Sequence, residues 1–312
     1  MSIAVVFPGQ GSQNKEMADS FSDVSSFNEV IDQGSEILNY DIREAIKNEK
    51  KINDTIYTQP LMLTISYAMW DTLIKKTGIK ANIGAGHSLG EYTALVANNT
   101  LSFSDALMLV KKRAEFMSSA MVDIDGAMAA VIGLDGNKVR DICKEASKDG
   151  AIIEAVNFNC PSQTVIAGHS VAVEDISPVL KTSGAKIVKK LPVSLAAHTS
   201  LLKSVSNELR DELKGINFNL DNSFDVIHNY DLSVSKNEVR FIDCLSMQVC
   251  SPVRWIETMQ TFKSIDISDV IEVGPGNVLQ GLVKRFDKAL RVHSFSSIED
   301  INSIKQVLYY KL

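Results

Sequence analysis

The sequence is poor in the residues that mark several classes of protein. Its 312 residues include four cysteines and no C-x-x-C pair, and a chain of this length does not need disulfides for stability. We therefore expect reduced thiols and a cytoplasmic location. No apolar run approaches the roughly 20 residues that cross a bilayer, and the N-terminus lacks the basic leader of a signal peptide. Membrane association is not expected.

An excess of positive charge is also missing. Lys and Arg number 32 against 38 for Asp and Glu, which gives a net charge of −6 and argues against general nucleic-acid binding. The five histidines form no cluster with cysteines or acids at ligand spacing, so no metal is expected. The loop Gly9–Gln13 begins like a dinucleotide fingerprint, but Asn14 stands in place of its third glycine, which argues against a Rossmann cofactor site.

The most informative stretch that is present is Gly86-His87-Ser88-Leu89-Gly90. It fits the nucleophile-elbow pattern G-x-S-x-G, in which a serine occupies a sharp turn between a strand and a helix. Glycine is needed at both ends because the turn has unusual backbone angles and the helix packs close to the strand. The pattern predicts an exposed Ser88 hydroxyl at the N-terminus of a helix.

The residues around this motif predict an α/β body. A further helix is expected to begin after an N-cap at Ser104 and to run to about Met121. Apolar runs and helical periodicity predict strands at Ile3–Phe7, Ala81–Ala85, Phe224–His228, Asp269–Val273 and Leu290–His293, and helices at Phe27–Leu38, Thr58–Lys76, Leu89–Ala97 and Ser200–Leu213.

The middle of the chain predicts a second unit with the order β-α-β-β-α-β, which is that of a ferredoxin-like fold. We therefore expect an α/β fold in which a large α/β-hydrolase-like domain, residues 1–124 and 199–312, carries an inserted ferredoxin-like small domain, residues 125–198. The strands of the insert are expected at Ala127–Ile132, Ala151–Val156, Gln163–Ala167 and Lys186–Val193, and its helices at Lys138–Ser147 and Val171–Thr182.

A serine hydroxyl is a weak nucleophile until a base takes its proton, and histidine is the usual base. His87 is next to the serine, but in an elbow its side chain points away. His198 lies where the insert rejoins the body, and a seam between domains is where a cleft is expected. We therefore interpret His198 as the base, with a surface or packed histidine as the alternative.

Arg113 is a second candidate. It lies at the edge of the apolar stripe of the helix that ends near Met121, about 70° from the centre of the stripe by helical geometry. Such an arginine either extends along the surface to solvent or points into a cleft, where a guanidinium binds carboxylate through two parallel hydrogen bonds. The stripe consists of Leu107, Val110, Ala114, Met117 and Met121.

Together these motifs resemble the family of malonyl-CoA:acyl carrier protein transacylases of bacterial type II fatty acid synthesis. The resemblance covers essentially the whole chain, with the motifs in order and at family spacing. The matching segments are Phe7–Gln13, Gly86–Tyr92, Arg113, Asn157–Asn159, Gln163–Gly168, His198 and Glu272–Gly276.

The resemblance implies a role for each of these site residues. Ser88 is the nucleophile and His198 its base, and a main-chain carbonyl at Gln248, rather than an aspartate, orients the histidine. The backbone N–H groups of Gln10 and Leu89 form the oxyanion hole.

It also implies that Arg113 holds the malonyl carboxylate and that Asn157 and Gln163 line the cleft. The expected substrates are malonyl-CoA and an acyl carrier protein, with no cofactor, and the chain is expected to be a monomer. One departure is Ala196-Ala197, where the family commonly has Pro-Ser before the histidine; this change loosens the local backbone.

Three other functions stay open on the sequence. An esterase or thioesterase shares the elbow, but such enzymes usually place an Asp or Glu between the serine and the histidine on a strand end of the main body, and none is evident here. An acyltransferase serving a polyketide synthase would use the same residues with a different carrier protein and acyl group. A non-catalytic carrier-protein scaffold would not need Ser88, His198 and Arg113 together.

Overall fold

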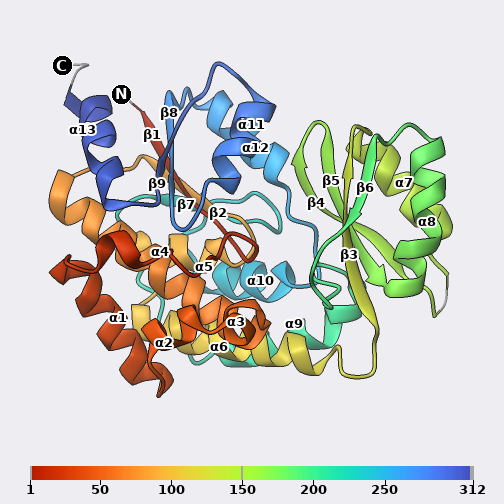
Figure 1. Ribbon diagram of the computed structural model, residues 1–312, viewed down its shortest axis with the longest axis horizontal. Helices are drawn as coiled ribbons and strands as arrows, with labels where there is room; N and C mark the ends of the chain where they lie inside the picture. The colour runs from red at the N-terminus through yellow and green to blue at the C-terminus, as the bar shows by residue number, and fades with distance from the viewer. Residues whose placement is uncertain (1, 149, 310–312) are drawn as a thin grey trace.

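Two β-sheets organise the molecule, and Figure 1 shows them side by side. The computed structural model describes residues 2–148 and 150–309. In these residues, one sheet has five parallel strands in the order β7-β2-β1-β8-β9, and the other has four antiparallel strands in the order β4-β5-β3-β6. The first sheet consists of β1 (Ile3–Phe7), β2 (Ile83–Gly86), β7 (Asp225–Ile227), β8 (Asp269–Val273) and β9 (Arg291–Phe295).

The central strand β1 explains why the parallel sheet is covered on both faces. All five of its residues are apolar and buried, as expected for a parallel strand between two layers of helices. Val5 and Phe7 pack into one hydrophobic cluster and Ala4 and Val6 into another. The first cluster contains residues of α1 (Ser25–Leu38), α4 (Thr55–Thr77), α5 (Gly90–Ala97) and α6 (Phe103–Ser119), and the second contains residues of α11 (Trp255–Ser264) and α12 (Val278–Phe286).

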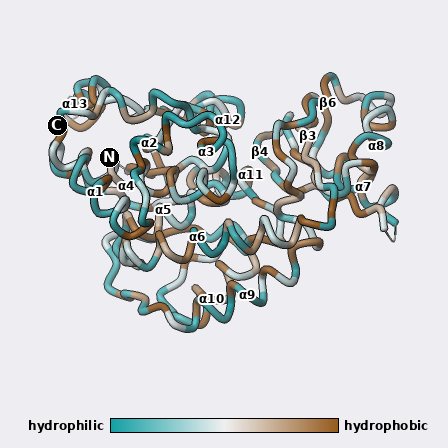
Figure 2. The backbone as a smooth tube through the Cα atoms, turned by 60° about the horizontal axis from the view of Figure 1, so that its bottom comes forward, coloured by the Kyte–Doolittle hydropathy of each residue, from teal (hydrophilic) through white to brown (hydrophobic). Residues whose placement is uncertain are grey.

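The large part contains further helices, and α9 is representative of those with one buried face. Figure 2 shows both hydrophilic and hydrophobic residues along α9, whose buried residues include Val205, Leu209 and Leu213. This pattern is typical of a helix with one face on the core. These elements are α2 (Ile42–Lys47), α3 (Glu49–Asn53), α9 (Lys203–Leu213), α10 (Glu238–Gln248) and α13 (Ile301–Tyr309), with short 3-10 turns at Asp19–Phe21, Ser200–Leu202 and Ile298–Asp300.

The antiparallel sheet and its two helices have the predicted β-α-β-β-α-β order. Alternate residues of β3 face opposite ways: Ala127 and Ala129 contact the cluster beneath α7 and α8, whereas Met128 belongs to the core cluster of the large part. The elements are β3 (Gly126–Ile132), α7 (Gly136–Ala146), β4 (Ile153–Cys160), β5 (Gln163–His169), α8 (Ser170–Thr182) and β6 (Ile187–Lys190).

The two parts are joined along the edge of β4. The Phe158 N–H donates to the carbonyl of Val253 at 3.0 Å, and the Val253 N–H donates to the carbonyl of Val156 at 2.8 Å. A segment of the large part therefore runs beside the small sheet. This junction lies close in sequence to Ser251, which reaches the site described below.

The predicted N-cap at Ser104 is wrong. Ser102 caps α6, because its backbone is extended and its side chain accepts the N–H of Asp105 at 3.0 Å, while Ser104 lies within the helix. The spacing Ser102-x-x-Asp105 is that of a capping box and could have identified the cap. In the described residues, none of the helices is long and apolar enough to span a bilayer.

Candidate active site

The elbow predicted from the sequence is present between β2 and α5. Ser88 has a left-handed backbone with φ of 54°, which is uncommon outside glycine. A Cβ on Gly86 would lie 1.8 Å from the carbonyl carbon of Gly90, and one on Gly90 would lie 2.0 Å from the carbonyl oxygen of Phe7. Both positions therefore require glycine, and the helix begins directly behind the serine.

His198 lies against the serine. Its Nε2 is 2.7 Å from Ser88 Oγ, and its Nδ1 is 2.8 Å from the carbonyl of Gln248 and 3.1 Å from that of Ser251. A carbonyl only accepts hydrogen bonds, so Nδ1 carries the proton and Nε2 is free to accept the Ser88 proton. Two carbonyls thus orient the ring, with no carboxylate on Nδ1 among the described residues.

The surroundings keep this imidazole neutral. His198 is 3% exposed, and burial, followed by the positive charge of Arg113, lowers its pKa to about 3. The hydrogen bonds to the Gln248 and Ser251 carbonyls oppose that shift but do not cancel it. A neutral ring is the form that can act as a general base.

Arg113 points into the site, which decides between the two readings of its position. It is 1% exposed, and its Nη2 lies 3.3 Å from Ser88 Oγ and 3.0 Å from Gln248 Oε1. Nη1 donates to Gln59 Oε1 at 2.5 Å, and the guanidinium lies 5.5 Å from the ring centre of Tyr92. Burial lowers the pKa of Arg113.

No carboxylate of the described chain pairs with this guanidinium, and its Nε has no hydrogen-bond partner there. A buried cation without an anion is unfavourable. The arrangement therefore suits an anionic group that arrives beside Ser88.

The loop after β1 packs against the elbow. A Cβ on Gly9 would lie 2.5 Å from the His87 carbonyl oxygen and 3.7 Å from the Leu89 nitrogen. Gln10 follows in that loop, and its side chain donates to Thr55 Oγ1 at 3.1 Å. Within the described residues, neither the Gln10 nor the Leu89 backbone N–H is paired, so both are available to an oxyanion.

Asn157 and Gln163 lie on the paired strands β4 and β5. Asn157 Oδ1 and Gln163 Oε1 are buried without a partner in the described chain. No hydrogen bond there connects either side chain to Ser88. The residue two positions on, Asn159, does reach the elbow, since its Oδ1 lies 2.8 Å from His87 Nε2.

A model of the acyl transferase domain family matches residues 4–303 of this chain. The chain belongs to the acyl transferase family. A protein of Escherichia coli K12 named malonyl CoA-acyl carrier protein transacylase is 39% identical over 286 residues, which cover 91% of this chain and 92% of that protein.

Solved structures resemble the acyl transferase over nearly its full length. The acyl-carrier-protein S-malonyltransferase of Burkholderia pseudomallei has a TM-score of 0.94 and 41% identity, covering 98% of this chain and 100% of that one. A malonyl-transacylase solved in complex with a type II polyketide acyl-carrier protein has a TM-score of 0.95 and 34% identity, with 98% and 100% covered.

Asn229 is one of the residues in the acyl transferase site that the sequence did not reveal. Asn229 Oδ1 accepts the Ser88 N–H at 2.7 Å, and its Nδ2 donates to the Gly86 carbonyl at 2.7 Å. The side chain thus bridges both sides of the elbow. Asn229 follows β7, the strand that pairs with β2. Polar residues that follow neighbouring parallel strands gather at one edge of a sheet. Its position after a strand could therefore have indicated that Asn229 lies near Ser88.

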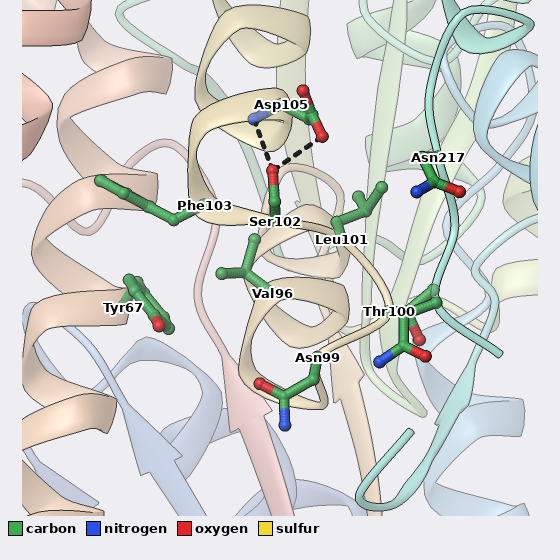
Figure 3. A pocket seen from close by; sticks show the side chains of 10 residues that line it. Tyr67, Val96, Asn99, Thr100, Leu101, Ser102, Phe103, Asp105 and Asn217 are labelled. Carbon is green, nitrogen blue, oxygen red and sulfur yellow. Dashed lines mark hydrogen bonds between the residues drawn. The ribbon is translucent and has the colours of Figure 1, made fainter. Parts of the chain in front are cut away.

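A further cavity of the acyl transferase lies away from Ser88. A cavity of about 340 Å³ sits between the C-terminal end of α5 and the start of α6, with Thr100, Phe103 and Asn217 among its lining residues. Figure 3 shows the Ser102–Asp105 capping bonds on its wall. None of the lining residues belongs to the Ser88 constellation. In the described residues, no group of three or more His, Cys, Asp or Glu could hold a metal.

Proposed function

We propose that this acyl transferase moves the malonyl group from malonyl-CoA to the phosphopantetheine thiol of an acyl carrier protein for fatty acid biosynthesis, through a malonyl ester on Ser88. The main support for this proposal is the position of Arg113. Its guanidinium is buried, has no carboxylate partner in the described chain, and lies 3.3 Å from the Ser88 hydroxyl. A dicarboxylic acyl group bound as an ester at Ser88 presents a carboxylate one methylene away. The names of the relatives support the same substrates.

In the first half-reaction, Ser88 Oγ attacks the thioester carbonyl while His198 Nε2 takes its proton. A carbon–oxygen bond forms, and the carbonyl oxygen becomes an anion held by the N–H groups of Gln10 and Leu89. Removing one such donor typically raises the barrier by about 3–4 kcal/mol. The anion then collapses, the carbon–sulfur bond breaks, and His198 returns the proton to the CoA sulfur.

In the second half-reaction, the carrier thiol enters the place left by CoA. His198 takes the thiol proton, and the sulfur attacks the ester carbonyl. The carbon–oxygen bond breaks, and the proton passes to Ser88 Oγ. This is a ping-pong scheme with the serine as the transient carrier, so the reaction as written needs no cofactor.

Two of the alternatives fit the site less well. An esterase of the usual type orients its histidine with a carboxylate, whereas His198 Nδ1 faces the carbonyls of Gln248 and Ser251. A non-catalytic scaffold gives no reason for a hydroxyl 2.7 Å from an imidazole. The polyketide alternative shares the chemistry and differs only in the carrier protein and the acyl group; a polyketide acyl-carrier protein is the partner in one of the solved complexes.

We further assign the large part, residues 1–124 and 199–312, as α/β-hydrolase-like and residues 125–198 as a ferredoxin-like insert. The support is an elbow that follows a parallel strand, and an antiparallel sheet whose order is β4-β5-β3-β6. Asn157 and Gln163 are assigned to the cleft wall because their buried oxygens lack partners in the described residues. A monomer and a cytoplasmic location stay predictions.

The test is intact-protein mass spectrometry after incubation with malonyl-CoA. We expect a gain of one malonyl group, absent in Ser88→Ala, and loss of that group when holo carrier protein is added. Steady hydrolysis of malonyl-CoA at the rate of transfer would instead favour a thioesterase. A wild-type protein that takes up no malonyl group refutes the proposal.

A further inference from the structure

A buried carboxylate lies behind the elbow and takes no part in the chemistry above. Glu91, in the first turn of α5, is 0% exposed. Its Oε1 lies 2.7 Å from His228 Nδ1, and its Oε2 accepts the Asn229 N–H at 3.1 Å and Gln248 Nε2 at 2.6 Å. A buried carboxylate is tolerated only when donors satisfy it, and three converge on this one.

The side-chain amide of Gln248 joins this carboxylate to the arginine. Gln248 Nε2 donates to Glu91 Oε2 and to the Ser88 carbonyl, the latter at 3.0 Å, while its Oε1 accepts from Arg113 Nη2 at 3.0 Å. If the amide were flipped by 180°, its oxygen would face two acceptors, the Glu91 carboxylate and the Ser88 carbonyl, and its NH₂ would face the Arg113 guanidinium. Glu91 therefore fixes the orientation in which Gln248 offers an acceptor to Arg113.

Glu91 is also the negative charge that faces Arg113 from behind. A direct ion pair would occupy the guanidinium fork that binds carboxylates and compete with the substrate. A charge one amide away stabilises the buried cation and leaves the fork open toward Ser88. Burial lowers the pKa of Arg113, whereas Tyr92 and then Glu91 oppose that shift.

His228 completes the group on the far side of Glu91. It is 0% exposed and packs edge-on against the Phe241 ring. Its Nε2 has no partner among the described residues, so Glu91 is the polar group that its ring contacts. His228 meets Glu91 at Oε1 and leaves Oε2 to Asn229 and Gln248.

We propose that Glu91, acting through the Gln248 amide, is the buried counter-charge that orients Arg113 and so determines the preference for acyl groups that bear a carboxylate. The inference rests on the proposed function and adds a specificity determinant to it. Glu91 is a positioning residue, since its hydrogen bonds go to Gln248, His228 and Asn229 and not to the reacting atoms.

The experiment compares acylation of Ser88 by malonyl-CoA and by acetyl-CoA, which share the thioester and differ in the carboxylate. Intact mass against time gives the rate and the half-saturating concentration for each donor. The variants are Glu91→Gln, Gln248→Leu and the two combined. Glu272→Gln, which alters another fully buried carboxylate away from the constellation, is the matched control.

We expect Glu91→Gln and Gln248→Leu each to lower the malonyl-to-acetyl ratio of kcat/KM by about tenfold, because a hydrogen bond to a charged group is lost. The loss should appear mainly as a higher half-saturating concentration of malonyl-CoA. If Glu91 acts through Gln248, the combined variant has the same ratio as Gln248→Leu alone. Glu272→Gln keeps the wild-type ratio.

Equal losses with both donors, or losses that add in the combined variant, overturn the proposal. Should Glu91→Gln fail to fold, an unchanged ratio in Gln248→Leu overturns it equally. Failure of the proposed function is a different result, in which the wild-type protein itself gains no malonyl group.

Discussion

The guanidinium of Arg113 lies 3.3 Å from the hydroxyl oxygen of Ser88, so the cation and the nucleophile share one site. The same hydroxyl is 2.7 Å from His198 Nε2. Under the proposed function, an acyl group on Ser88 therefore lies beside both the base and the cation. We then expect the charge of the acyl group to decide how well it is accepted.

Arg113→Ala should separate binding of the carboxylate from the chemistry at the thioester. We expect malonyl transfer to fall by about 100-fold, since a charge-assisted bidentate pair is lost, while acetyl transfer is retained or rises. The measurement is kcat/KM for the two donors. Arg113→Lys, which keeps the charge without the planar fork, should fall between. Unchanged malonyl transfer in Arg113→Ala would rule out the carboxylate clamp.

The value of kcat/KM for acylation should not fall as the pH is lowered from neutrality. Burial and the charge of Arg113 lower the pKa of His198 from 6.5 to about 3, so the ring stays neutral and competent as pH falls from 8 toward 5. An unshifted histidine would lose more than about tenfold in kcat/KM at pH 5. The measurement is kcat/KM for malonyl-CoA against pH.

The Arg113→Ala variant tests whether the charge of Arg113 lowers the pKa of His198. Removing that positive charge removes one cause of the lowered pKa of His198, so the acid limb should move to higher pH in the variant. A limb that stays in place, or moves to lower pH, would contradict the electrostatic cause.

Much of the fold and the core of the site followed from local sequence. The buried run Ile3–Phe7 and the elbow glycines were predicted because periodicity and backbone sterics act over a few residues. The chain order β-α-β-β-α-β of the small part was predicted for the same reason. The N-cap of α6 was misplaced by two residues, from Ser102 to Ser104, because both serines precede the same apolar stripe.

The polar side chains that hold the elbow and Arg113 in place could not be predicted in this way. Asn229 is 141 residues from Ser88 in sequence, and the burial of Glu91 depends on segments that are distant in the chain. Which of several polar side chains meet there depends on packing between elements far apart in the chain. Gln59, which holds Arg113 from α4, was missed for the same reason.

Asn229→Ala should slow acylation by both donors equally. The side chain bridges the Ser88 N–H and the Gly86 carbonyl, and its loss frees a left-handed serine to leave its productive position. We expect kcat to fall about tenfold or more with the malonyl-to-acetyl ratio unchanged. Asn219→Ala, at an exposed position beside the distant cavity, is the control. A change in the ratio would show that Asn229 contacts the acyl group instead.

Gly86→Ala should prevent the elbow from forming. The added methyl would lie 1.8 Å from the Gly90 carbonyl carbon, a backbone atom that cannot move aside. We expect loss of soluble folded protein, or a destabilisation above about 4 kcal/mol. Gly281→Ala is the matched control, since nothing lies within 4 Å of the added methyl and the position is within α12; it should gain about 0.5–1 kcal/mol. Thermal and urea unfolding measure both.

Glu272→Gln should change how stability depends on pH. Burial raises the pKa of Glu272 to about 7, although the backbone N–H groups of Gln280 and Leu279 oppose the shift. Between pH 4.5 and 7 the folded state then binds more protons than the unfolded state, so this group makes stability fall as pH rises through that window.

The corresponding measurement is the free energy of unfolding of wild type and Glu272→Gln at several pH values. Relative to the variant, the wild-type protein should lose up to about 3 kcal/mol between pH 4.5 and 7, and the difference should be constant above that range. The sign is the decisive part. If the wild-type protein instead gains stability against the variant as pH rises, the donors at the start of α12 outweigh burial, and Glu272 is held as a carboxylate that caps the helix.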